Sequence, residues 1–109
     1  MTTTLTDPGP CGFLARTEAN SEDGMEVTIT VRTGCANIRG MVEALGPAFD
    51  AYDLCLRKPG DGPLYEYARD HFPAHASCPV ISGILKAVEG ECGLALKKDV
   101  SIRFLAEGE

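Results

Sequence analysis

Residues 25–45 read MEVTITVRTGCANIRGMVEAL and place an expected strand directly before an expected helix. Apolar and polar residues alternate over positions 25–32, and this period of two predicts a strand with one buried face. The apolar residues then recur at helical spacing, at Ile38, Met41, Val42 and Leu45. Gly46-Pro47 predicts the end of that helix. The stretch therefore favours a sheet with a helix packed on its apolar face.

The residues before this stretch predict a partner strand. Positions 13–19 are weakly typical of a strand, and Asp23-Gly24 is a strong hairpin signal between the two segments. We therefore expect an antiparallel hairpin. Residues 1–10 are polar and contain Pro8-Gly9-Pro10, which predicts a flexible lead outside the fold.

The residues after it predict further helices and a closing strand. Positions 49–57 are compatible with a short helix or a strand. A helix is expected over residues 64–71, ended by Pro73. Ser77 is a good N-cap residue for a last helix, and residues 100–104 alternate as a strand would.

These elements predict an α+β fold of order β-β-α-(α)-α-β. We expect a two-layer sandwich in which helices cover one face of a small, mainly antiparallel sheet. The predicted single domain spans residues 11–105, between the lead at 1–10 and a solvated tail at 106–109.

The composition argues against several classes of partner. The chain has 109 residues and a net charge of −6, with few and scattered Lys and Arg, which disfavours nucleic acid and anionic membranes. No apolar run approaches the roughly 20 residues that span a bilayer. The N-terminus lacks the basic start and apolar core of a secretory signal, so we expect a cytoplasmic location.

Five cysteines are many for a cytoplasmic domain of this size, and no C-x-x-C motif is present. Cys35 and Cys78 are both expected where a helix begins, and there unpaired N–H groups and the helix dipole favour the thiolate. A hairpin brings its outer ends together, so Cys11 should lie near Cys35. Cys78 reaches the same edge if the last long helix runs alongside the first with the same polarity.

Three converging thiols predict a metal site, because thiolates suit zinc and iron–sulfur clusters. His75 is a candidate fourth ligand, although an exposed loop histidine is the simpler interpretation. Cys55 is a rival ligand or a buried core residue. Cys92 lies about 20 Å along the last helix from Cys78, so we interpret it as structural.

This arrangement resembles the NifU/IscU-type iron–sulfur cluster scaffold domain over about residues 11–90. Cys11-Gly12 opens a strand, Gly34-Cys35 starts a helix, and Cys78 starts a later helix, as the family's three cysteine ligands do. The resemblance implies that these three cysteines bind a cluster. The residue before the third cysteine is Ser77, where the family has a histidine. The stretch from Cys78 to Val100 is also similar to a small group of uncharacterised prokaryotic proteins.

Three functions remain open from the sequence. The first is a metal- or cluster-binding protein, with an iron–sulfur cluster or zinc as cofactor and iron–sulfur or thiol-handling proteins as partners. The second is a non-catalytic structural or interaction domain with cysteines in its core. The third is a thiol-redox or thiol-transfer protein, whose reactive thiolate would be Cys35 or Cys78.

Overall fold

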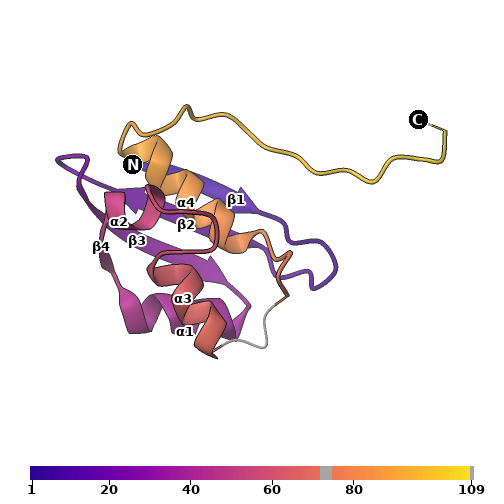
Figure 1. The fold of residues 1–109 in the computed structure, drawn as a ribbon, viewed down its shortest axis with the longest axis horizontal. Coiled ribbons are helices and arrows are strands. Elements are labelled where there is room, and N and C mark those ends of the chain that lie inside the picture. The colour runs from indigo at the N-terminus through magenta and orange to yellow at the C-terminus, as the bar shows by residue number, and fades with distance from the viewer. Residues whose placement is uncertain (72–74, 109) are drawn as a thin grey trace.

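The computed structural model describes residues 1–71 and 75–108, which form four strands and four helices (Figure 1). The strands are β1 (Thr2–Thr6), β2 (Ala15–Asn20), β3 (Glu26–Thr33) and β4 (Ala48–Asp50). The helices are α1 (Ala36–Leu45), α2 (Ala51–Cys55), α3 (Pro63–His71) and α4 (Val80–Glu91).

The strands form one antiparallel sheet in the order β1-β2-β3-β4. The central hairpin joins β2 and β3, and its register pairs Ala15 with Thr33 at one end and Asn20 with Thr28 at the other. Asp23 shapes the connecting turn, because its carboxylate accepts hydrogen bonds from the N–H groups of Met25 and Glu26 at 2.9 and 3.0 Å. These bonds hold the pKa of Asp23 below its ordinary value. The hairpin predicted between residues 13 and 32 is confirmed.

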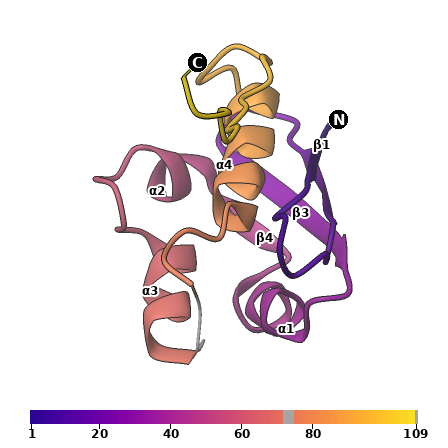
Figure 2. The same ribbon diagram turned by 90° about the vertical axis from the view of Figure 1, so that its right-hand side faces the viewer.

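The helices lie on one face of the sheet and leave the other face open (Figure 2). Helix α4 packs on β1 and β2, and α1 packs on β3. The core between these layers contains alternate residues of β3, such as Val27 and Ile29, together with Met41 of α1 and Ile84 of α4. The predicted class, an antiparallel sheet covered by helices, is confirmed.

The element order differs from the prediction at both ends of the chain. Thr2–Thr6 form the edge strand β1, so the flexible lead predicted over residues 1–10 is wrong for this segment. The physical reason is that β1 pairs with β2 and its Thr2 and Thr4 hydroxyls bond to α4. At the other end, the predicted closing strand at residues 100–104 is not formed, and this part of the chain runs extended beyond the sheet.

In the middle of the chain, the structure decides between the helix and the strand that the sequence left open. Residues 49–57, which fitted either a helix or a strand, contain both: β4 ends at Asp50 and α2 begins at Ala51. Asp50 separates them as an N-cap, since its carboxylate accepts hydrogen bonds from the N–H groups of Tyr52 and Asp53. The expected helix over residues 64–71 is confirmed as α3, and its predicted end at Pro73 lies outside the described residues.

Candidate functional site

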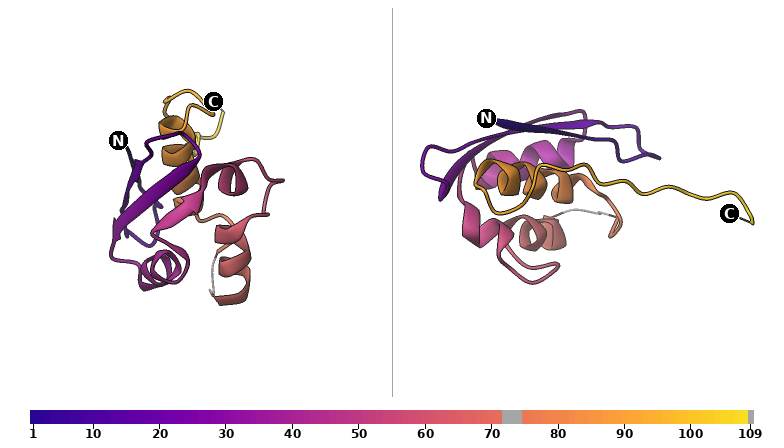
Figure 3. Two further views of the ribbon diagram at one scale, coloured as in Figure 1. Left: turned by 90° about the vertical axis from the view of Figure 1, so that its left-hand side faces the viewer. Right: turned by 90° about the horizontal axis from the view of Figure 1, so that it is seen from above.

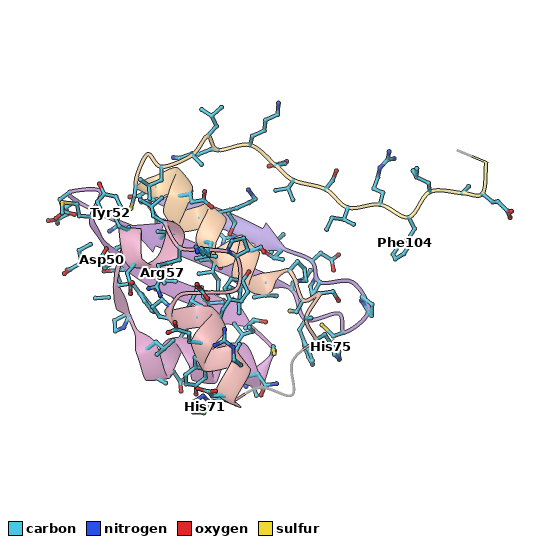
Figure 4. All side chains as sticks on the ribbon, in the orientation of Figure 1. Asp50, Tyr52, Arg57, His71, His75 and Phe104 are labelled. Atoms are coloured by element: carbon cyan, nitrogen blue, oxygen red, sulfur yellow. The ribbon has the colours of Figure 1, made fainter. Side chains whose placement is uncertain are left out.

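Cys11, Cys35 and Cys78 lie toward the same end of the sheet. Cys11 precedes β2 and Cys35 follows β3, where Ala15 and Thr33 are paired. The first turns of α4 reach this end as well, because the Gly83 carbonyl accepts a hydrogen bond from Thr4 Oγ1 at 2.8 Å. His75 lies in the segment before α4, away from His71 at the end of α3 (Figure 4).

The donor groups at this end are not gathered into one cluster. Among residues 1–71 and 75–108, no group of three or more His, Cys, Asp or Glu side chains is placed to hold one. Cys11 and His75 are exposed, and Cys55 belongs to α2 on another part of the molecule.

The two cysteines expected at helix starts differ in their placement. Cys35 is the N-cap residue of α1, as predicted, but its thiol forms no capping hydrogen bond. For α4 the N-cap is Pro79, so Cys78 lies one residue outside the helix and the N-cap predicted at Ser77 is wrong. A tight turn precedes the helix instead, with the Cys78 N–H bonded to the His75 carbonyl at 3.0 Å.

Cys55 and Cys92 are placed as structural thiols. The Cys55 thiol is partly buried and donates to the Leu85 carbonyl at 3.8 Å. Burial raises the pKa of Cys55 to about 12, with further contributions from Glu89 and from Cys92. Burial also raises the pKa of Cys92, the C-cap residue of α4. Neither side chain is a ready nucleophile, because the reactive species is the thiolate.

One half of the outer edge of β3 has no strand beside it. Strand β4 pairs only with Glu26, Val27 and Thr28, and the Ile29 N–H bonds to the Pro47 carbonyl at 2.9 Å. Among the described residues, no strand pairs with the rest of β3 on this side. Alternate residues of a strand face the same neighbour, so the backbone groups of Val31 point outward like those of Ile29.

A groove runs beside this open half-edge, between β3 and α1. Its volume is about 350 Å³, and its lining is mostly apolar. The strand side is formed by Ile29, Thr30 and Val31. The opposite side is formed by Arg39, Val42, Glu43, Gly46 and Pro47. Free backbone groups beside an apolar groove are what an extended peptide needs in order to add a strand to a sheet. The sequence analysis missed this site. Its only signal is a difference in length, because β3 has eight residues whereas its neighbour β4 has three.

Residues 95–108, which we call the C-terminal arm, run back over α4 and then project beyond the sheet and helices (Figures 1 and 3). Val100, Ile102 and Phe104 alternate with polar residues along it and are 58%, 89% and 105% exposed. Phe104 points into solvent (Figure 4). The arm thus combines a strand pattern with apolar side chains left in water.

Comparison with known proteins gives one match. A family model described as a family of unknown function, DUF6951, matches residues 2–104. No curated protein and no solved structure matches the chain. Among the described residues, no helix has both the length and the apolar character needed to cross a membrane.

Proposed function

Since the chain belongs to the DUF6951 family, whose function is unknown, we propose a role from the geometry of the chain itself: a non-catalytic interaction domain. It binds an extended peptide segment as an added strand along the open half of β3. The observation that carries the proposal is the outer edge of β3 at Val31, which no strand covers among the described residues, beside the groove against α1. Next along this edge, the Thr33 carbonyl accepts a hydrogen bond from Arg39 Nη1 at 3.1 Å.

The chemistry of the edge supports this mode of binding. A strand laid along β3 forms hydrogen bonds with the outward backbone groups of Val31, which are sequence-independent. Alternate side chains of that strand then enter the groove and contact Val31 and Val42. The bound segment is therefore expected to alternate apolar and polar residues, with β-branched or aromatic side chains at the apolar positions.

A peptide titration tests the proposal. The full chain is used with Ile102→Asp and Phe104→Asp, so that its own apolar arm does not compete. The probe is an eight-residue peptide of alternating threonine and valine, and a matched peptide with two central prolines, which lack the N–H group, is the control. We expect backbone amide shifts and slower hydrogen exchange at Val31 and Thr33 with the first peptide only. The absence of any change on β3 and α1 with either peptide would overturn the proposal.

Metal binding by Cys11, Cys35 and Cys78, with His75 or Cys55 as a further ligand, stays a prediction. Protein purified without oxygen would then contain iron and sulfide, or zinc, and Cys35→Ser would remove them. Iron–sulfur or thiol-handling partners, thiol transfer and a cytoplasmic location also stay predictions. No cluster of metal-donor side chains forms among the described residues, which favours the interaction domain over a metal site.

A further inference from the structure

We infer that the segment which occupies the groove is the C-terminal arm of a second copy of this chain, so that two copies exchange arms in a symmetric dimer. This inference rests on the proposed function, because it names the occupant of the same edge. Four observations support it: the pattern of the arm, the fit of the groove, the path that the arm takes and the charge of the arm.

The arm has the properties of a strand that lacks a sheet. Val100, Ile102 and Phe104 would all point to one face of such a strand, and Ser101 and Arg103 to the other. The free energy of the exposed apolar side chains falls when they leave water. The residues with this pattern lie within the range matched by the family model.

The open half of β3 offers what this strand needs, and the edge of β1 does not. At β3, the groove gives the apolar face of the arm Val31 and Val42 to contact. On β1, the side chains that face the helices are threonines, and two of them are already bonded: Thr2 Oγ1 to Glu91 and Thr4 Oγ1 to the Gly83 carbonyl. A strand added beside β1 would meet polar groups and α4 rather than an apolar groove.

The arm starts at the wrong end of the molecule for its own groove. Glu91, at the end of α4, bonds to Thr2 and to the Ser21 N–H, so the arm leaves beside the β2–β3 turn. The open half of β3 lies at the opposite end, where Thr33 pairs with Ala15. Between them, β4 occupies the near half of the β3 edge. From there the arm runs back over α4, on the β1 side of the sheet and away from the outer edge of β3. It then projects beyond the end where β1 and β2 are connected, and there a neighbouring molecule can accept it (Figure 3).

Charge also favours contact between copies. The arm contains Lys97, Lys98 and Arg103 against two acidic residues, Asp99 and Glu107, whereas the whole chain has a net charge of −6. A basic segment is therefore attracted to the acidic body of another copy. Because a two-fold axis makes the exchange reciprocal, each dimer contains two arm–groove contacts.

Sedimentation of four forms of the full chain tests the inference. We expect the wild type to dimerise with rising concentration. In the arm variant, Ile102→Asp with Phe104→Asp, dimerisation should weaken by at least about tenfold, because carboxylates enter an apolar groove. The groove variant Val42→Asp should show the same loss. Ser101→Asp, on the other face of the arm, is the matched control and should dimerise like the wild type.

Mixing the two defective variants separates exchange between copies from docking within one chain. A chain with an intact arm and a chain with an intact groove should form a mixed dimer more readily than either variant dimerises alone. If Val42→Asp reduces folding, Val42→Thr keeps the shape, replaces one methyl group by a hydroxyl and should weaken the dimer less.

The outcomes are distinguishable. A monomeric wild type at 0.1 to 1 mM, about the range in which weak association is seen, overturns the inference but not peptide binding at β3. If Val42→Asp still dimerises like the wild type and the arm variant does not, the arm binds outside the groove, and this result also overturns the inference. Loss of peptide binding in the titration above overturns the proposed function itself.

Discussion

The Glu91 side chain joins three parts of the chain that are far apart in sequence. Its carboxylate accepts hydrogen bonds from Thr2 Oγ1 at 2.8 Å and from the Ser21 N–H at 2.9 Å, and it lies 3.4 Å from the N-terminal amino group. Only 10% of this side chain is exposed. The bond from the Ser21 N–H is the main cause that holds the pKa of Glu91 below its ordinary value. One carboxylate therefore ties α4 to β1 and to the hairpin turn.

Glu91→Ala should destabilise the fold by about 1–3 kcal/mol, because the Ser21 N–H and the Thr2 hydroxyl lose their acceptor. Because its pKa is lowered in the folded protein, Glu91 stabilises the fold at pH values above its ordinary pKa. This stabilisation is lost as the pH falls through the pKa that Glu91 has in the folded protein. Urea unfolding at pH 7 and pH 3 should thus show a smaller difference between wild type and variant at pH 3. Glu22→Ala, an exposed neighbour, is the control and should have little effect at either pH. Equal losses for both variants would contradict this role.

Cys55 and Cys11 should differ strongly in reactivity, although both are free thiols. The pKa of Cys55 is raised to about 12 by burial, whereas Cys11 is exposed. At pH 8 the thiolate fraction of Cys55 is therefore very small, and iodoacetamide should modify Cys11 much faster. Peptide mass spectrometry of the folded protein measures both rates. Modification of Cys55 at the rate of Cys11 would show that α2 opens readily.

At the scale of elements, close contact between α4 and β1 depends on a glycine. A Cβ atom added at Gly83 would collide with the hydroxyl of Thr6. It would also lie only 3.1 Å from the Cβ atom of Thr6. At Gly40 in α1, by contrast, an added Cβ meets nothing within 4 Å. The two glycines occupy similar positions inside helices but differ in what faces them, so one permits packing and the other only weakens its helix.

The two substitutions to alanine should therefore have opposite effects. Gly83→Ala should destabilise the protein by about 1–3 kcal/mol, because α4 or β1 must shift. Gly40→Ala should stabilise it by about 0.5–1 kcal/mol through helix propensity. Thermal unfolding of both variants measures the difference. A stable Gly83→Ala protein would mean that α4 is free to move away from β1.

At the scale of the whole molecule, the two ends of the chain have unequal roles. The N-terminal strand β1 completes the sheet and contacts α4, whereas the C-terminal arm lies outside the layers (Figure 1). Removal of residues 1–6 should therefore expose β2 and the inner side of α4 and prevent cooperative unfolding. A chain ending at Lys98 should unfold like the arm variant, because it retains every strand and helix. Circular dichroism during heating measures both. Equal loss of structure in the two truncations would contradict this division.

The sequence by itself determined the central hairpin, α1, α3 and the class of the fold. These elements have strong local signals: strict alternation in β3, helical spacing in α1 and the turn at Asp23-Gly24. It also placed Cys11 and Cys35 at one end, because the register of a hairpin follows from its turn.

Only the tertiary structure decided the rest. Thr2–Thr6 have no apolar alternation, and they become a strand because β2 supplies hydrogen bonds and α4 accepts those of the threonine hydroxyls. Residues 100–104 have the alternation but no neighbour within the sheet, so they remain extended. The open half of β3 depends on the length of β4, which local preferences do not encode. A strand needs a partner as well as a pattern, and the choice of partner is a property of the folded chain.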